Sequence, residues 1–119
     1  RLLRKICSYC KEPQVISRLI AERVGLLKII HTNKEFELFR GKGCKRCFHT
    51  GYKGRVGITE ILTFSSQIKE LVLARAGEVK IKGAARAEGM KTMREDGLAK
   101  VVAGLTTLEE VLRVTAADE

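Results

Sequence analysis

The stretch GCKRCFHTGYKGRVGITEIL, residues 43–62, decides how this chain folds. It contains two cysteines, four glycines and four basic side chains, and it ends in an alternating apolar run. Two residues between cysteines allow a tight turn to direct both sulfur atoms toward one point. Residues 55–64 alternate like a β-strand, with Glu60 as the one carboxylate on the apolar face, where it needs a partner or an edge position.

A second Cys-x2-Cys pair precedes this stretch, with 33 residues between the two pairs. Two such turns that face each other place four sulfurs at the corners of a tetrahedron, which suits Zn²⁺. A site closed by four thiolates leaves no position for a catalytic water, so it is structural. The sequence therefore predicts a structural zinc ion, whose ligands are Cys7, Cys10, Cys44 and Cys47.

The residues beside the cysteines fit this site. We expect Gly43 and Gly51 to let backbone N–H groups turn toward sulfur, and Gly54 and Gly57 to permit tight turns nearby. Four thiolates around one Zn²⁺ carry a net negative charge, which nearby cations would offset while lowering the thiol pKa values. The cations within a few residues of the ligands are Lys5, Lys11, Lys42, Lys45 and Arg46.

Other readings of the four cysteines stay open at this point. Free buried cysteines are common, and a dithiol redox centre needs only one pair. Disulfides would fit a secreted domain, and iron–sulfur clusters also take four cysteines, at other spacings. His49, two residues after Cys47, could substitute as a ligand, but we expect it beside the ligands or in solvent. We expect His31 in a loop.

The chain divides at residue 64 into two parts of different character. Residues 1–64 contain all four cysteines and both histidines. In this part the patterns predict a helix that Pro13 opens and that ends before Gly25, and a strand over 35–40.

Residues 65–119 contain no cysteine and carry four short helical patterns. We expect helices from Ser65 or Ser66 to near Gly77, over 78–88, from Thr92 to Gly104, and after Thr107, where Thr107 and Glu110 form a capping box. The predicted fold class is α+β. Residues 1–64 form a small tetracysteine zinc-binding module with short antiparallel strands, and residues 65–119 form a small all-helical subdomain.

Bulk properties narrow the class of protein. The chain has 119 residues with a net charge of +9, and aromatic residues make up only 5%. The basic excess could attract nucleic acid, anionic lipid or an acidic protein, but few aromatics are available for base stacking. No apolar stretch is long enough to span a bilayer, and no nucleotide-binding or hydrolase motif occurs. Because the sequence begins at Arg1, we expect a piece of a longer protein, with no catalytic residue in this part.

Three segments together resemble a known family. They are RLLRKICSYCKEP (1–13), GCKRCFHTGYKGRVGITEIL (43–62) and GMKTMREDGLAKVVAGLTTLEEVLRVT (89–115). In this order they resemble the C-terminal end of the ATPases of bacterial type II secretion and type IV pilus assembly. Gly51, Tyr52, Gly54, Arg55 and Glu60 match the family's glycine-rich segment and following strand. The family often has proline where this chain has Ser8, a departure that touches no ligand.

The resemblance implies a cytoplasmic, hexameric P-loop ATPase that is held at the inner membrane by platform proteins and drives pilin or pseudopilin assembly. It implies that the four cysteines bind zinc, and that ATP and Mg²⁺ bind in a part upstream of Arg1. The implied partners are the motor domain of the same chain, neighbouring subunits and the platform proteins. The alternative function is a zinc-ribbon nucleic-acid-binding module, although we do not expect nucleic acid as a partner. A third class, a thiol oxidoreductase, predicts a reducible disulfide within one cysteine pair.

Overall fold

The computed structural model describes residues 1–26 and 36–116, and for residue 36 only the backbone. Short strands and helices make the chain an α+β protein, as the sequence predicts. The elements are β1 (Leu2–Ile6), β2 (Lys11–Ile16), α1 (Arg18–Val24), β3 (Phe36–Gly41), the 3-10 turn η2 (Lys45–Cys47), β4 (Tyr52–Gly57), α2 (Ser66–Leu73), α3 (Glu78–Ala87), α4 (Met93–Val102) and α5 (Leu108–Val114). The predicted loop position of His31 lies outside the described residues.

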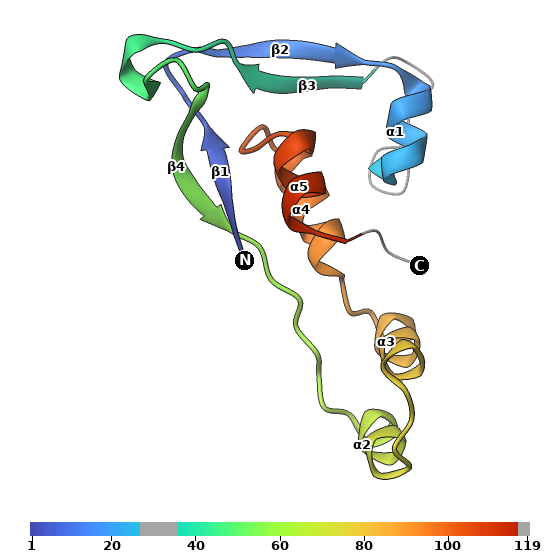
Figure 1. Ribbon diagram of the computed structural model, residues 1–119. Coiled ribbons are helices and arrows are strands. Elements are labelled where there is room, and N and C mark those ends of the chain that lie inside the picture. The colour runs from blue at the N-terminus through green and yellow to red at the C-terminus, as the bar shows by residue number, and fades with distance from the viewer. Residues whose placement is uncertain (27–35, 117–119) are drawn as a thin grey trace.

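Two antiparallel strand pairs position the cysteines. β1 pairs with β4, and β2 pairs with β3. Lys11, the first residue of β2, lies opposite Gly41, the last residue of β3. The connection from β1 to β2 and the connection from β3 to β4 therefore meet at the same end of the strands (Figure 1). Each of these two connections carries one cysteine pair.

The helix predicted from Pro13 begins later than expected. Pro13 belongs to β2 and pairs with Phe39, and the helix α1 starts at Arg18 after the N-cap Ser17. The prediction was wrong because proline also fits an edge strand, where its missing N–H breaks no ladder. The predicted end is confirmed, since Gly25 is the left-handed C-cap residue with φ 88°.

The strand predicted over 55–64 is shorter and begins earlier. β4 runs from Tyr52 to Gly57, and its pairing ends where the backbone of Arg1 exchanges two hydrogen bonds with Ile58. The prediction was wrong because residues beyond Ile58 find side-chain partners instead of a neighbouring strand. Glu60, expected to need a partner, accepts the Met93 N–H at 3.1 Å and lies 3.7 Å from the Lys82 ammonium.

Gly54 and Gly57 also differ from expectation, because both lie inside β4 rather than in turns. The pairing of β1 with β4 is irregular between Arg4 and Ile6, opposite the region of Gly54. Gly54 has φ 83°, a conformation that suits such a bulge and that other residues adopt at a cost.

The four helices predicted in the second half are all confirmed, as α2 to α5. Side-chain caps set the starts of α2, α4 and α5, where Ser65, Thr92 and Thr107 each accept an N–H from three residues later. α3 begins after Gly77 without a side-chain cap. Gly83, an unfavourable residue inside a helix, does not interrupt α3.

The buried core draws on both halves of the sequence. It is formed by Leu3, Ala21, Leu26, Leu38, Ile58, Leu98, Val101 and Val111. α4 and α5 therefore pack against β1, β3 and α1, while α2 and α3 contribute nothing to this cluster. The predicted division at residue 64 stays a prediction.

α2 and α3 form a projecting arm. They pack against each other, each with one buried residue, Ile68 in α2 and Ala85 in α3, and Figure 1 shows them well apart from the strands. The radius of gyration is 16.9 Å, whereas a compact domain of this length has about 13.5 Å. The molecule measures 55 × 32 × 17 Å, so the arm makes it elongated.

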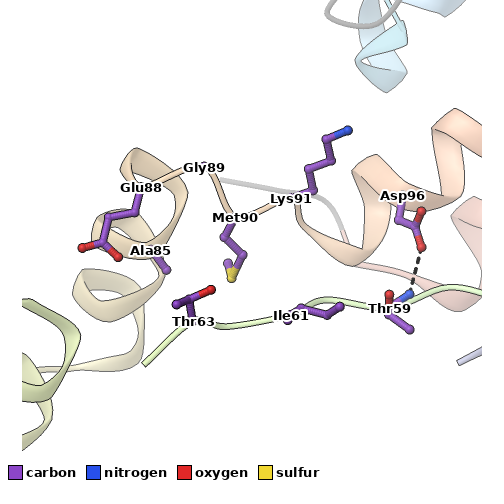
Figure 2. A pocket seen from close by; sticks show the side chains of 9 residues that line it. All are labelled: Thr59, Ile61, Thr63, Ala85, Glu88, Gly89, Met90, Lys91 and Asp96. Atoms are coloured by element: carbon purple, nitrogen blue, oxygen red, sulfur yellow. Dashed lines mark hydrogen bonds between the residues drawn. The ribbon is translucent and has the colours of Figure 1, made fainter. Parts of the chain in front are cut away.

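Two connecting segments, residues 58–65 and 88–92, attach this arm to the rest of the structure. The Thr59 N–H donates to Asp96 at 2.9 Å, and the Ser65 hydroxyl donates to Glu88 at 2.9 Å. Between the segments lies a cavity of about 330 Å³. Figure 2 shows Met90 pointing into this cavity and Lys91 pointing away from it.

Candidate metal centre

The two cysteine turns bring all four predicted ligands together. The Sγ atoms of Cys7, Cys10, Cys44 and Cys47 all lie within 4.8 Å of one another. The Sγ–Sγ distances are 3.8 Å from Cys7 to Cys44, 3.8 Å from Cys10 to Cys47 and 3.7 Å from Cys44 to Cys47. Cys7 and Cys47 are buried, and the other two are half-buried.

These distances fit a single tetrahedral ion. Four sulfurs at about 2.3 Å from one Zn²⁺ lie about 3.8 Å from each other. A disulfide requires a separation of about 2.05 Å, so these sulfurs are not bonded in pairs. A multi-iron cluster would place an inorganic core between the sulfurs and hold them further apart. The donor set therefore fits one zinc ion best.

Backbone N–H groups point at the sulfurs, as expected for the two glycines. Gly43 donates to Cys10 Sγ at 3.3 Å, and Gly51 donates to Cys47 Sγ at 3.2 Å. Cys44 adds a third such bond, to Cys47 Sγ at 3.2 Å. Donors of this kind stabilise thiolates, the form in which cysteine binds metal.

The thiols differ in how readily they ionise. Burial of Cys47 opposes its charged form, but the N–H donors from Cys44 and Gly51 outweigh burial and lower its pKa to about 6. Burial instead raises the pKa of Cys10 to about 11, despite the hydrogen bond from Gly43. The polypeptide alone thus favours thiolate at one of these two cysteines. A divalent cation is what allows neighbouring thiols to ionise together.

The two turns are locked together by a close approach of the backbone. The Cys7 N–H donates to the Gly51 carbonyl at 2.9 Å, and the Lys42 N–H donates to the Cys10 carbonyl at 3.1 Å. A Cβ atom added at Gly41 would lie 2.0 Å from the Gly51 oxygen. Glycine at position 41 is therefore required for the turns to meet.

The structure does not bring histidine into the cluster. His49 is exposed, and only cysteines form the metal-ligating group among the described residues. Phe48 and His49 have φ 55° and 60°, the left-handed region that costs a residue with a Cβ of order 1 kcal/mol. The His49 N–H donates to the Cys44 carbonyl at 2.8 Å, so the cysteine turn imposes this conformation.

A polar network, which the sequence did not predict, joins the strands to α5. The Glu110 carboxylate, 1% exposed, contacts the guanidinium groups of Arg4 and Arg113. The Tyr52 hydroxyl lies 2.8 Å from the Thr107 hydroxyl. Half of the predicted capping box is present, because Thr107 accepts the Glu110 N–H, but the Glu110 side chain turns to Arg4 instead.

The chain matches the family described as type II/IV secretion system protein over residues 1–113. The chain belongs to this family. The matched residues of the secretion system protein family include the four cysteines, both strand pairs and the described helices, except the last residue of α5, Val114.

Curated relatives from both kinds of machine are similar to the chain. The type IV pilus assembly ATPase PilB of Thermus thermophilus is 41% identical over 97% of this chain. The type II secretion system ATPase E of Vibrio cholerae is 40% identical over 97%, and the type II secretion system protein E of Aeromonas hydrophila 37% over 99%. The chain spans 13%, 22% and 23% of these relatives' lengths, respectively. In the described part of this family member, no helix has the length and apolar character to cross a membrane.

Proposed function

We propose that this chain is a zinc-stabilised, C-terminal part of an ATPase that powers type II secretion or type IV pilus assembly. The single observation that carries the proposal is the four-sulfur cluster with edges of 3.7 and 3.8 Å, in a chain that belongs to this family. Cys7, Cys10, Cys44 and Cys47 are the zinc ligands in this proposal. The relatives' names as ATPases support an ATPase as the whole protein.

The metal supplies a cross-link between two turns that are far apart in sequence. The chain's own residues orient the sulfurs and hold the two turns together. Gly43 and Gly51 direct N–H groups at the sulfurs, and the strand pairs β1–β4 and β2–β3 hold the turns face to face. A closed site of this kind acts as a structural element, so we assign no catalytic residue here.

The mechanical role follows from how the centre is connected. β1 leads directly into the first cysteine turn, and Arg4 on β1 is fixed to Glu110 on α5. A displacement of α5 is therefore passed to the strands and the cysteine turns as one rigid unit. In the whole protein, a cytoplasmic hexamer, this unit packs on the motor domain or a neighbouring subunit and on the platform proteins at the inner membrane. ATP and Mg²⁺ bind in the remaining part of the polypeptide.

A substitution in the full-length protein tests this function. Cys44→Ser removes one ligand, while Ser66→Ala changes an exposed, non-ligating residue of α2 and is the control. We expect Cys44→Ser to lose bound zinc and secretion or piliation but to keep nucleotide binding. Full secretion or piliation by a zinc-free Cys44→Ser protein would refute the proposal.

One observation favours a second candidate, a nucleic-acid-binding module. Phe48 is 87% exposed in the second turn, and the exposed cations Lys45 and Arg46 lie three and two residues before it. An exposed aromatic ring among cations can stack on an unpaired base. A salt-dependent gel shift with single-stranded nucleic acid, lost in Phe48→Ala, would support this candidate; no shift at low salt would remove it.

A further inference from the structure

A second cavity opens beside the first cysteine turn, with a volume of about 350 Å³. It lies between this turn, the start of β4 and the connection from α4 to α5. The Ile6 N–H donates to the carbonyl of Leu105, in that connection, at 2.9 Å. Three lysines line it, Lys5 from β1, Lys11 from β2 and Lys53 from β4. No acidic side chain belongs to the lining that the described residues provide.

The lysines are held at the cavity by neighbouring groups. The Lys11 ammonium lies 4.5 Å from the centroid of the Phe39 ring, and the Lys53 ammonium lies 5.1 Å from that of Tyr9. At Gly104, with φ 80°, an added Cβ atom would lie only 2.7 Å from the Lys11 ammonium. Glycine at this turn thus leaves the space that the ammonium group uses.

None of these lysines donates a hydrogen bond to a cysteine sulfur in the described part of the chain. The N–H groups that reach sulfur there come from the backbone of Gly43, Cys44 and Gly51. None of the three lysines forms an ion pair with a described carboxylate. The three ammonium groups carry the same charge, so an anion in this cavity would be attracted by all of them.

We propose that this cavity binds the phosphate group of a phosphorylated ligand. Lysine binds phosphate as a point charge, and three lysines match an anion that carries more than one negative charge. Ser8, which also lines the cavity, adds a hydroxyl donor. The phosphate group comes from a soluble phosphoryl compound or from an anionic lipid headgroup, which share this chemistry.

Lysine acetylation followed by mass spectrometry tests this site in the zinc-loaded full-length protein. The rates at Lys5, Lys11 and Lys53 are measured with pyrophosphate, with phosphatidic acid vesicles in phosphatidylcholine, and with sodium chloride at equal ionic strength. We expect pyrophosphate or the vesicles to slow acetylation at Lys11 and Lys53 at least threefold relative to chloride. Protection by pyrophosphate assigns a soluble ligand, and protection by vesicles alone assigns a lipid headgroup.

A lysine remote from the cavity provides the control. Lys80 is an exposed residue of α3, on the projecting arm. We expect its acetylation rate not to change, and we expect Lys53→Gln, but not Lys80→Gln, to weaken pyrophosphate binding at least fivefold in a calorimetric titration. No protection by either probe, or equal protection of Lys80, would overturn the proposal. The acetylation experiment uses the wild-type protein, so it tests the proposal even if Lys53→Gln folds poorly.

Discussion

Arg4 and Glu110, separated by 106 positions in the sequence, are joined by both backbone and side chain. The Arg4 N–H donates to Glu110 Oε2 at 3.2 Å, and the Arg4 guanidinium lies 2.6 Å from Glu110 Oε1. Through this carboxylate, the strand that carries the first cysteine turn is fixed to the last helix.

Replacement of this carboxylate should weaken the whole fold. Glu110→Gln keeps the shape but removes the charge that Arg4 and Arg113 share, so we expect the free energy of unfolding to fall by about 2 kcal/mol. Urea denaturation of the zinc-loaded protein measures the change. Glu109→Gln, at the exposed neighbouring position, is the control and should change stability by less than about 0.5 kcal/mol. Equal effects of the two substitutions would show that the Arg4 contact is unimportant.

The same carboxylate should make stability depend on pH. Burial opposes the charge of Glu110, but hydrogen bonds from Arg113 and Arg4 outweigh burial and hold its pKa below the ordinary value of 4.5. The unfolded chain therefore takes up this proton first, so the contribution is complete above about pH 5 and is lost as the pH falls through the folded-state pKa.

We expect the stability difference between the wild type and Glu110→Gln to shrink as the pH is lowered below about 4.5. Denaturation curves of both proteins between pH 7 and pH 3 measure this difference. Acid also removes metal from the thiols, but that loss is common to both proteins and cancels. A difference that stayed constant to the lowest pH would contradict the lowered pKa of Glu110.

Substitutions at two glycines distinguish the effect of close backbone packing from the effect of helix propensity. A Cβ at Gly41 would lie 2.0 Å from the Gly51 oxygen, whereas a Cβ at Gly83 meets nothing within 4 Å. We expect Gly41→Ala to separate the cysteine turns and reduce zinc retention during dialysis. Gly83→Ala should instead raise stability by about 0.5–1 kcal/mol, because alanine is the better helix former. Normal zinc retention in Gly41→Ala would show that the turns can meet in another way.

Local sequence accounts for the parts that were predicted correctly. The cysteine spacing places two sulfurs on each turn, and caps such as Thr92 start helices without help from distant residues. Pro13 was misread because its strand exists only through pairing with Phe39, far along the chain. The Glu110 side chain was assigned to a local cap because nothing near it in sequence indicates Arg4. Local elements and the ligand spacing are thus predictable, whereas the distant partners of a single proline or carboxylate are not.

The projecting arm should open more easily than the body. α2 and α3 each bury one residue, Ile68 and Ala85, but add nothing to the main core. Local opening is easier where few apolar groups are buried, so we expect their amide hydrogens to exchange at least tenfold faster than those of β1 and α4. Hydrogen exchange with mass spectrometry of the full-length protein measures both regions. Equal protection of the arm would indicate a further contact that holds it.

The zinc content and its effect on folding test the central claim most directly. Native mass spectrometry, with and without a strong chelator, reports metal per chain, while circular dichroism follows the fold in the same samples. We expect one zinc ion per chain, and we expect its removal to disorder both strand pairs around the cysteine turns. A chain that contains no metal as purified and keeps its native spectrum and thermal transition in chelator would contradict the account.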